Sequence, residues 1–456
     1  MASRVVTMAR LLVPKVPLLV STTLVHYAYG PVKPSWSYRF SVTMALLRAF
    51  LAHLNEVPVS QSQIMSKMTD EKAPVNEGAI ATEAIVPKEY REKAAEIMER
   101  LLSLQGIDTT KLGWDWKQDP AAAEPLMGEW TETKVKDDNY KEGRTILYLH
   151  GGGYFLASVR THRWATWHMS RHAGAEVFSL EYRLAPDSPF PAAVQDALSA
   201  YLYLLNPPAD SGFAPIDPKN IVIMGDSAGG GLTYGTMLAI RDAGLPVPAG
   251  VIGWSPWLDL LHSMPSVLLN AGSDYLPAEG FTQGGQGSLK RIAKLAEAVE
   301  ADYVMQHHPD LPEIQYYASN AVLDCTYVSP LVEKNLEGAC PMLVITGDGE
   351  MLRDESIVFA KKNANASAPI QLLIYDDMPH VFQMFDFLPS AADAVQRSAD
   401  FIRQVTIGGE GVEKKSSYRV SVDGRLRALE DDAVVGWEAR VGKLGGGQAV
   451  LVQLQS

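Results

Sequence analysis

The sequence predicts an α/β fold with a mostly parallel central sheet and helices on both faces. From about residue 130, short apolar runs alternate with longer segments of helical periodicity. Such alternation is typical of a parallel sheet whose strands are joined by crossover helices. The expected strands are 145–149, 177–180, 221–224, 251–254, 342–345 and 372–375. The expected helices between them are 161–172, 191–205, 229–243, 354–363 and 391–405.

A helical cap is expected over this sheet. Apolar residues recur at helical spacing in 36–55 and again from Pro87 to a stop at Gly106, whereas 56–86 is polar and without a pattern. Residues 262–320 separate two strands by more than a crossover needs, so this insertion should add helices at the carboxyl edge of the sheet. Open α/β sheets bind ligands at that edge.

Three regions follow from these patterns. Residues 1–125 form an N-terminal arm and cap region, and 126–405 form the catalytic domain with the 262–320 insertion. Residues 406–456 are a C-terminal extension, in which 417–429 has the Asp-Gly turn of a hairpin.

Composition and charge exclude several classes of protein. The 456 residues are 47% hydrophobic and 20% charged, which is the balance of a folded globular chain. A net charge of -13 gives no electrostatic basis for binding nucleic acid. Only two cysteines occur, without metal-ligand spacing, so the sequence predicts no disulfide, no metal and no cofactor, and a reducing, cytoplasmic location.

The first 55 residues differ from the rest in charge, with six Lys and Arg and no Asp or Glu. Prolines and Lys15 interrupt their apolar run, which is too short to span a bilayer. Two hypotheses fit this arm: a lid over the catalytic domain, or a peripheral contact with an anionic membrane surface. The oligomeric state stays open.

The strongest local motif is Gly225-Asp226-Ser227-Ala228-Gly229, which follows one expected strand and opens one expected helix. This is the context of a nucleophile elbow, where a sharp turn exposes the serine and leaves no room for neighbouring Cβ atoms. The motif predicts that Ser227 is a nucleophile.

A second motif, His150-Gly151-Gly152-Gly153, follows the strand 145–149. Consecutive glycines can turn amide N–H groups toward one point, as an oxyanion hole requires. We expect the N–H groups of Gly152, Gly153 and Ala228 to form that hole, and His150 to be a structural hydrogen-bonding group.

The remaining partners of such a serine follow in the order acid, then histidine. His380 comes directly after the last expected strand and is the expected general base. The segment 347–355 after the strand 342–345 offers four carboxylates. Asp354 has the position of a helix N-cap, which leaves Asp348 or Glu350 as the acid.

Together with these motifs, three further segments carry a family resemblance: Glu181 to Pro186, Pro189 to Ala193 and Leu352 to Glu355. Over about residues 145–385 the chain resembles the hormone-sensitive lipase family of α/β-hydrolase carboxylesterases. The resemblance implies the α/β-hydrolase fold and aligns Glu350 with the family's triad aspartate, so Glu350 is favoured and Asp348 is the alternative. It also implies that Arg183 and Asp196 fix loops near the elbow.

The sequence therefore predicts a serine carboxylic-ester hydrolase acting on a small to medium hydrophobic ester, such as an acetyl ester in natural-product or sterol metabolism. The alternative is a family member that does not hydrolyse esters, namely an acyltransferase, a lactonase or a ligand-binding relative. Four aromatic residues in segments near the carboxyl edge are candidates for the substrate pocket: Tyr154, Phe155, Trp254 and Tyr275.

Overall fold

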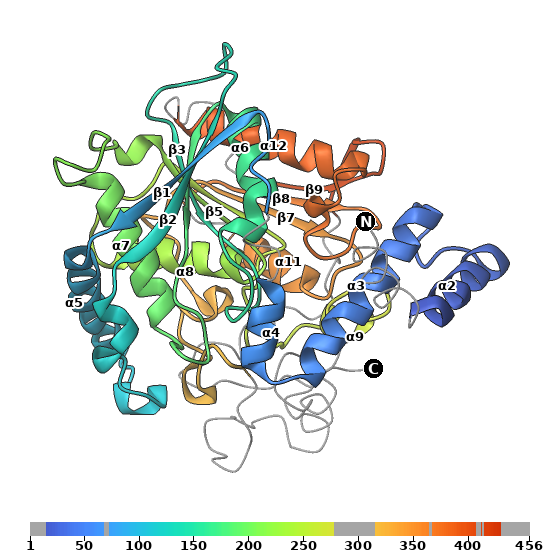
Figure 1. Cartoon of the computed structure of the whole chain (residues 1–456), viewed down its shortest axis with the longest axis horizontal. Coiled ribbons are helices and arrows are strands. Elements are labelled where there is room, and N and C mark those ends of the chain that lie inside the picture. Colours follow the sequence, from blue (N-terminus) through green and yellow to red (C-terminus); the bar gives the residue numbers. More distant parts are fainter. Residues whose placement is uncertain are drawn as a thin grey trace, which may run out of the picture.

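The computed structural model of the chain describes residues 15–67, 73–277, 315–363, 367–406, 412 and 415–429 (Figure 1). Ten strands form one sheet in the order β1-β2-β4-β3-β5-β6-β7-β8-β9-β10. Their bounds are β1 Ala79–Val86, β2 Leu126–Thr133, β3 Thr145–Leu149, β4 Glu176–Leu180, β5 Ile221–Asp226, β6 Gly250–Trp254, β7 Met342–Gly347, β8 Ile370–Tyr375, β9 Lys415–Val420 and β10 Leu426–Ala428.

The central strands, from β4 to β9 in that order, are parallel, and the two ends of the sheet are antiparallel. Leu149 at the end of β3 pairs with Gly225 near the end of β5, and Asp226 pairs with Trp254 at the end of β6. The loops that leave these strands therefore emerge side by side at one edge of the sheet.

Helices cover both faces of the sheet. Their bounds are α2 Val16–Tyr29, α3 Tyr38–Glu56, α4 Val59–Ser66, α5 Lys88–Leu104, α6 Arg163–Ala173, α7 Ala192–Leu205, α8 Ala228–Asp242, α9 Ser266–Leu269, α11 Arg353–Lys362 and α12 Pro389–Thr406. Side chains alternate along each strand, so Leu147 and Leu149 of β3 pack toward α5, α7 and α8, and Ile146 and Tyr148 pack toward α6 and α12.

The predicted α/β-hydrolase fold is confirmed, and each predicted strand and helix is present with its ends moved by a few residues at most. The hairpin predicted at 417–429 is also confirmed, with β9 and β10 paired around Gly424. The domain boundaries at 125 and 405 do not coincide with the edges of the sheet, because β1 lies before the first and β9 and β10 lie after the second. The segment 56–86 was wrongly left without structure, since it contains α4 and β1.

The N-terminal helices form part of the expected cap. In Figure 1, α3 and α4 lie beside the sheet near α9, and α2 lies outside α3. Of the predicted 262–320 insertion, 278–314 lies outside the described residues. Within the described part of the chain, no helix is long and apolar enough to cross a membrane.

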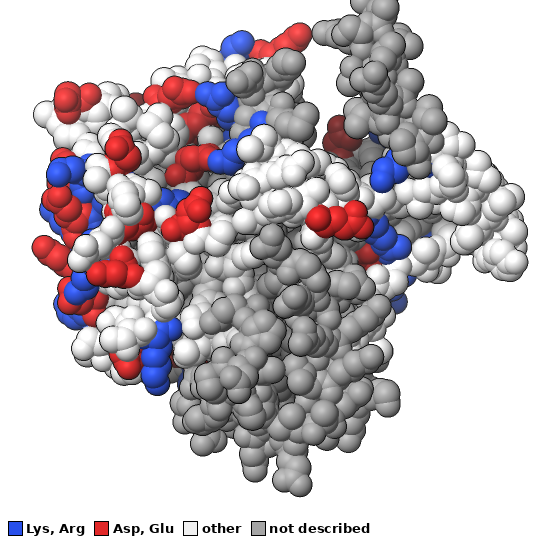
Figure 2. All heavy atoms as spheres, turned by 60° about the horizontal axis from the view of Figure 1, so that its bottom comes forward, with Lys and Arg blue, Asp and Glu red and all other residues white. Residues whose placement is uncertain are grey.

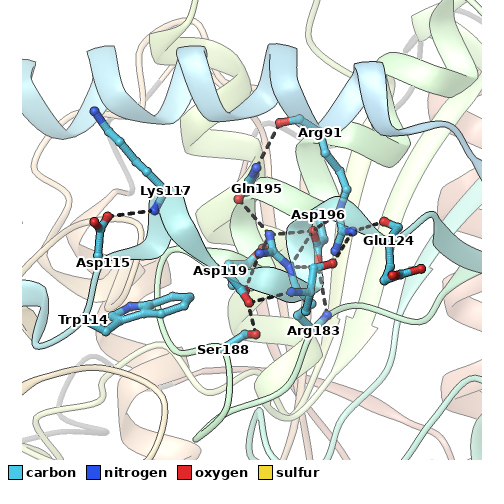
Figure 3. A network of polar contacts seen from close by, with 12 residues as sticks. Arg91, Trp114, Asp115, Lys117, Asp119, Glu124, Arg183, Ser188, Gln195 and Asp196 are labelled. Atoms are coloured by element: carbon cyan, nitrogen blue, oxygen red, sulfur yellow. Dashed lines mark hydrogen bonds and ion pairs between the residues drawn. The ribbon is translucent and has the colours of Figure 1, made fainter.

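A buried charge network links α5, the turn at Asp119, the segment after β4 and α7 (Figure 3). Arg183 donates to both Asp119, at 2.7 Å, and Asp196, and Arg91 donates to Asp196 at 3.1 Å. Burial opposes ionisation of Asp196, yet the two guanidinium groups hold the pKa of this carboxyl below its usual value. The network joins segments far apart in the sequence. That Arg183 and Asp196 fix loops near the elbow stays a prediction.

We predict that Asp196→Ala destabilises the chain by about 3–5 kcal/mol, because it leaves two buried guanidinium groups without their shared carboxylate. The matched control is Glu92→Ala, which breaks the exposed Lys88–Glu92 pair on α5 and should change stability by less than about 0.5 kcal/mol. Urea unfolding midpoints measure both. Equal effects of the two substitutions would contradict a structural role for the network.

Candidate active site

Ser227 lies on a strained turn between β5 and α8, with φ 54° and ψ -124°. The turn brings the helix close to the sheet: a Cβ on Gly229 would lie 2.0 Å from the carbonyl oxygen of Leu149, and one on Gly225 would lie 2.3 Å from the carbonyl oxygen of Gly229. Only glycine fits at these two positions, so the sequence around Ser227 folds as the elbow that its motif predicts.

His380 faces this serine from the loop after β8. Its Nε2 lies 2.8 Å from Ser227 Oγ, within hydrogen-bond distance. Burial lowers the pKa of His380 to about 3, so the imidazole is neutral near pH 7 and can accept the serine proton. The structure thus brings together two residues that are 153 positions apart in the sequence.

The glycine motif lies beside the elbow. Gly152 has φ 113°, and a Cβ there would lie 2.3 Å from the carbonyl oxygen of Leu156, so this turn also requires glycine. Asp226 joins the two motifs, because its Oδ1 accepts a hydrogen bond from Gly151 N at 3.2 Å. Ala228, the third expected donor, is the first residue of α8, where the N-terminal amides favour negative charge.

His150 is buried and its ring stacks on Tyr182 with centroids 4.3 Å apart. Burial lowers the pKa of His150 to about 4. Its Nδ1 lies 2.7 Å from the carbonyl oxygen of Gly151. The ring therefore contacts the backbone of the glycine loop, as expected for a structural hydrogen-bonding group.

Glu350 is fully buried at the end of β7. Its carboxylate accepts hydrogen bonds from Ser255 Oγ at 2.5 Å, from Thr346 Oγ1 at 2.5 Å and from Gly347 N at 3.0 Å. Ser255 Oγ in turn accepts from the backbone N–H of Val381, at 2.9 Å. Glu350 and the His380 loop are therefore linked through one serine.

The structure does not join Glu350 to His380 directly. The Nδ1 of His380 is buried and has no hydrogen-bond partner among the described residues. A buried donor of this kind normally has an acceptor.

Asp348, the alternative acid, is paired with basic side chains. Its carboxylate forms ion pairs with Arg419 at 2.8 Å, Lys33 at 3.5 Å and Arg353 at 3.6 Å. The N-cap expected at Asp354 is wrong, because Leu352 occupies that position. Asp354 Oδ2 instead accepts from Ser266 N at 3.0 Å.

Asp274 and Ser255 are site residues that the sequence reasoning missed. Asp274 is fully buried and accepts hydrogen bonds from the backbone N–H of Met351 at 2.7 Å and of His380 at 3.3 Å, so it spans the loops that carry the acid and the base. Arg48 of α3 donates to the carbonyl oxygen of Asp274 at 2.5 Å. Ser255 directly follows a predicted strand at the carboxyl edge, which is a usable signal, whereas Asp274 lies in the expected insertion, where no motif marks it.

His162 was also missed. Its Nε2 lies 3.4 Å from Asp226 Oδ2, beside the serine. Burial opposes protonation, but Asp226 raises the pKa of His162 above the usual histidine value.

A cavity of about 430 Å³ opens onto Ser227 and His380. The cap supplies one wall through Leu47, Phe50, Leu51 and Leu54 of α3 and Met65 of α4. The wall is largely apolar, with His162 and Gln315 among its polar groups.

Only one of the four aromatic candidates borders this cavity. Tyr275 lines it, with its ring 5.8 Å from that of His380. Tyr154, Phe155 and Trp254 are not among the residues that line this cavity. Tyr154 stacks on Tyr317, Phe155 packs in a small cluster around Leu54, and Trp254 donates to Ser398 under α12.

Within the described residues, no group of three His, Cys, Asp or Glu side chains is placed to hold a metal ion. The fold, the serine elbow and the facing histidine define the class of α/β-hydrolases.

Comparison with known proteins agrees with this class. Residues 146–384 match the family described as alpha/beta hydrolase fold. An acetyl-hydrolase of Streptomyces hygroscopicus is 33% identical over 62% of this chain and 81% of its own length. An esterase of Acinetobacter venetianus is 30% identical over 56% of this chain and 73% of its own length.

Solved structures point the same way. An esterase from the bacterial hormone-sensitive lipase family superposes with a TM-score of 0.55 at 26% identity, covering 80% of this chain and 98% of that one. EstE5 superposes with a TM-score of 0.56 at 29% identity, covering 80% and 99%. The chain belongs to the hormone-sensitive lipase family of α/β-hydrolases and is a carboxylic ester hydrolase.

Burial of Glu350 generates a prediction for stability. Desolvation, with Asp274 nearby, raises the pKa of Glu350 from 4.5 to about 8. A carboxyl that binds its proton more tightly in the folded chain favours folding most below pH 4.5, and this contribution is lost as the pH rises toward 8. Glu350→Gln removes the charge, so its melting temperature should exceed that of the wild type by at least about 2 °C at pH 9 and not at pH 5.

Thermal unfolding at the two pH values measures this difference. Asp348→Asn is the matched control, because three basic groups lower the pKa of Asp348 although burial opposes them. The control should be less stable than the wild type at pH 9. The prediction would be contradicted if the difference in melting temperature between Glu350→Gln and the wild type were less favourable to the variant at pH 9 than at pH 5.

Proposed function

We propose that this enzyme hydrolyses small, apolar carboxylic esters through an acyl-enzyme on Ser227. The observation that carries the proposal is the 2.8 Å contact between Ser227 Oγ and His380 Nε2, on a strained elbow in the wall of an apolar cavity. A neutral imidazole at hydrogen-bond distance is what a serine needs to become a nucleophile.

In the proposed reaction Ser227 Oγ attacks the ester carbonyl carbon while its proton passes to His380 Nε2. The carbonyl oxygen takes up the negative charge. His380 then gives the proton to the leaving alcohol oxygen as the carbon–oxygen bond breaks, which leaves an acyl group on Ser227. Water, deprotonated by His380, attacks this acyl group and releases the carboxylic acid.

The oxyanion is assigned to the backbone N–H groups of Gly152, Gly153 and Ala228. Gly152 and Gly153 both have positive φ, and Asp226 holds their loop against the elbow through Gly151. The N-terminus of α8 adds a favourable dipole at Ala228. Donors fixed in this way need no rearrangement as the charge develops, which is the basis of their effect on rate.

Glu350 is assigned as the triad acid. Three hydrogen bonds fix its carboxylate, and Ser255 connects it to the N–H of Val381, next to the base. When His380 takes the serine proton, its Nδ1–H needs an acceptor, and no described group fills that place in the resting enzyme. Burial raises the pKa of Glu350 to about 8 in the resting enzyme, and an imidazolium formed beside it would favour its ionisation, so the resulting carboxylate would stabilise the imidazolium.

Substrate size follows from the cavity. Its volume of about 430 Å³ lies near the lower end of the range of roughly 300–1,000 Å³ for small-molecule pockets, so we assign short acyl groups, acetyl first. The similar Streptomyces protein is named an acetyl-hydrolase, which supports this assignment. A deacetylation step on a natural product or a sterol is the kind of reaction that such a pocket fits.

Ser227→Ala should lower kcat for p-nitrophenyl acetate by at least about 10⁴-fold, because it removes the nucleophile. Thermal unfolding of the variant checks that the fold is intact. Ser103→Ala is the control, because it removes an exposed serine hydroxyl on α5 outside the cavity, and it should keep most of the turnover. Turnover by Ser227→Ala equal to that of the wild type would overturn the proposal.

Leu51→Trp should shift the chain-length preference toward shorter acyl groups, because Leu51 of α3 lines the cavity. The expected result is a fall of at least about tenfold in kcat/KM for p-nitrophenyl octanoate relative to the acetate. Ile64→Trp on α4 adds the same volume at an exposed position outside the wall. An unchanged ratio in Leu51→Trp would place the acyl group elsewhere.

A further inference from the structure

None of the residues of helix α2 is buried, although most of them are apolar or aromatic. Its sequence from Val16 to Tyr29 contains no Asp, Glu, Lys or Arg. A helix that packs only against other protein would bury an apolar face. In Figure 2 this part of the chain forms an uncharged projection at the side of the body.

The exposed side chains of α2 form a continuous surface. Val16, Val20, Leu24 and Tyr27 share one face at helical spacing, with exposed fractions that rise from 49% at Val16 to 72% at Tyr27. Tyr29 at the end of the helix is 88% exposed. We name Val16, Val20, Leu24 and Tyr27 the α2 face, since Tyr29 lies on another side of the helix.

Three polar side chains of the helix have hydrogen-bond partners within the protein. Ser21 Oγ donates to Leu18 O at 2.9 Å and Thr23 Oγ1 donates to Leu19 O at 2.7 Å, both within α2. His26 Nδ1 lies 3.0 Å from Ser41 Oγ of α3. Because these three groups have partners in the protein, moving them into a medium of low polarity costs less than moving unpaired polar groups would.

Charge around the helix favours one kind of partner. Lys15 and Arg39 flank α2 and the start of α3, whereas Lys33 is already paired with Asp348, and the first acidic residue in the sequence is Glu56. Tyr27, Tyr29 and Tyr38 gather at the end of α2, with the rings of Tyr27 and Tyr38 5.4 Å apart. Basic residues and tyrosines beside an apolar face are the composition of segments that lie in the headgroup region of a membrane.

The length of α2 sets how it would lie. Fourteen residues extend about 21 Å, less than the hydrocarbon thickness of about 30 Å. The helix is suited to lying along the interface. The same arm reaches the active site, because Phe50 of α3 lines the cavity and is 43% exposed.

We propose that the α2 face docks the enzyme on an anionic phospholipid surface, with α3 and the mouth of the catalytic cavity held next to the lipid. Esters dissolved in the bilayer would then reach Ser227 along α3. Only the delivery of bilayer esters to Ser227 rests on the ester hydrolysis proposed above, because the docking itself needs no catalysis.

The test is co-sedimentation of the full chain with vesicles of 70% phosphatidylcholine and 30% phosphatidylserine, and with pure phosphatidylcholine. We expect more binding to the vesicles that contain phosphatidylserine, and weaker binding at 0.5 M salt. Leu24→Glu with Tyr27→Glu should lower the partition coefficient at least about tenfold. The control pair Leu104→Glu and Val135→Glu, which changes exposed apolar residues elsewhere, should leave it unchanged.

Turnover of the water-soluble p-nitrophenyl acetate separates the two proposals. It should be the same in the wild type and both double variants, and thermal unfolding should confirm that all three are folded. Equal vesicle binding by the α2 variant and its control would overturn the docking proposal. The proposal would also be overturned if the wild type did not bind vesicles but formed a concentration-dependent dimer that the Leu24→Glu, Tyr27→Glu variant does not form. A second copy of the chain would then cover the α2 face. If Ser227→Ala loses ester turnover, vesicle binding should be unchanged. If Ser227→Ala keeps ester turnover, only the proposed function is overturned, and the docking proposal is not.

Discussion

The close approach of α8 to the ends of β3 and β5 is the constraint on which the site depends. Gly225 and Gly229 allow backbone atoms to meet where any side chain would collide. This contact holds Ser227 in its strained conformation and places the start of α8 beside the glycine loop. The surrounding structure must stabilise that strain, and the hydrogen bonds of Ser227 N to Trp254 O and of Trp257 N to Ser227 O contribute to it.

A second constraint is electrostatic. Asp274 and Glu350 are both fully buried, and burial raises their pKa values to about 6 and about 8. Two carboxyls near one another in a dry site oppose each other's ionisation. Their backbone hydrogen bonds nevertheless hold the loops of the acid and the base in place, so the positions of the reacting groups are obtained at the expense of stability at alkaline pH.

Much of this architecture could be predicted from the sequence, because each central strand is buried on both faces and reads as an apolar run. The edge strand β1 could not be predicted, since Ile80 and Ile85 are exposed and polar residues stand between them.

Among the site residues, Ser227 and His380 were recognised by their positions after strands. Asp274 was not, because its partners are backbone N–H groups of distant loops, and the sequence does not encode which loops meet. The family resemblance favoured Glu350 over Asp348, and the ion pairs of Asp348 with Lys33 and Arg419, from opposite ends of the chain, support that choice.

The last strands of the sheet connect the C-terminal segment to the catalytic loops. Arg419 of β9 forms ion pairs with Asp348, beside Glu350, and with Asp376, close to His380. β9 also pairs along the whole of β8. A chain ended at residue 405 would keep the serine, the histidine and the glutamate, yet it would expose the edge of β8 to strand pairing between molecules. Self-association of such a truncated enzyme would thus arise along the uncovered edge of β8.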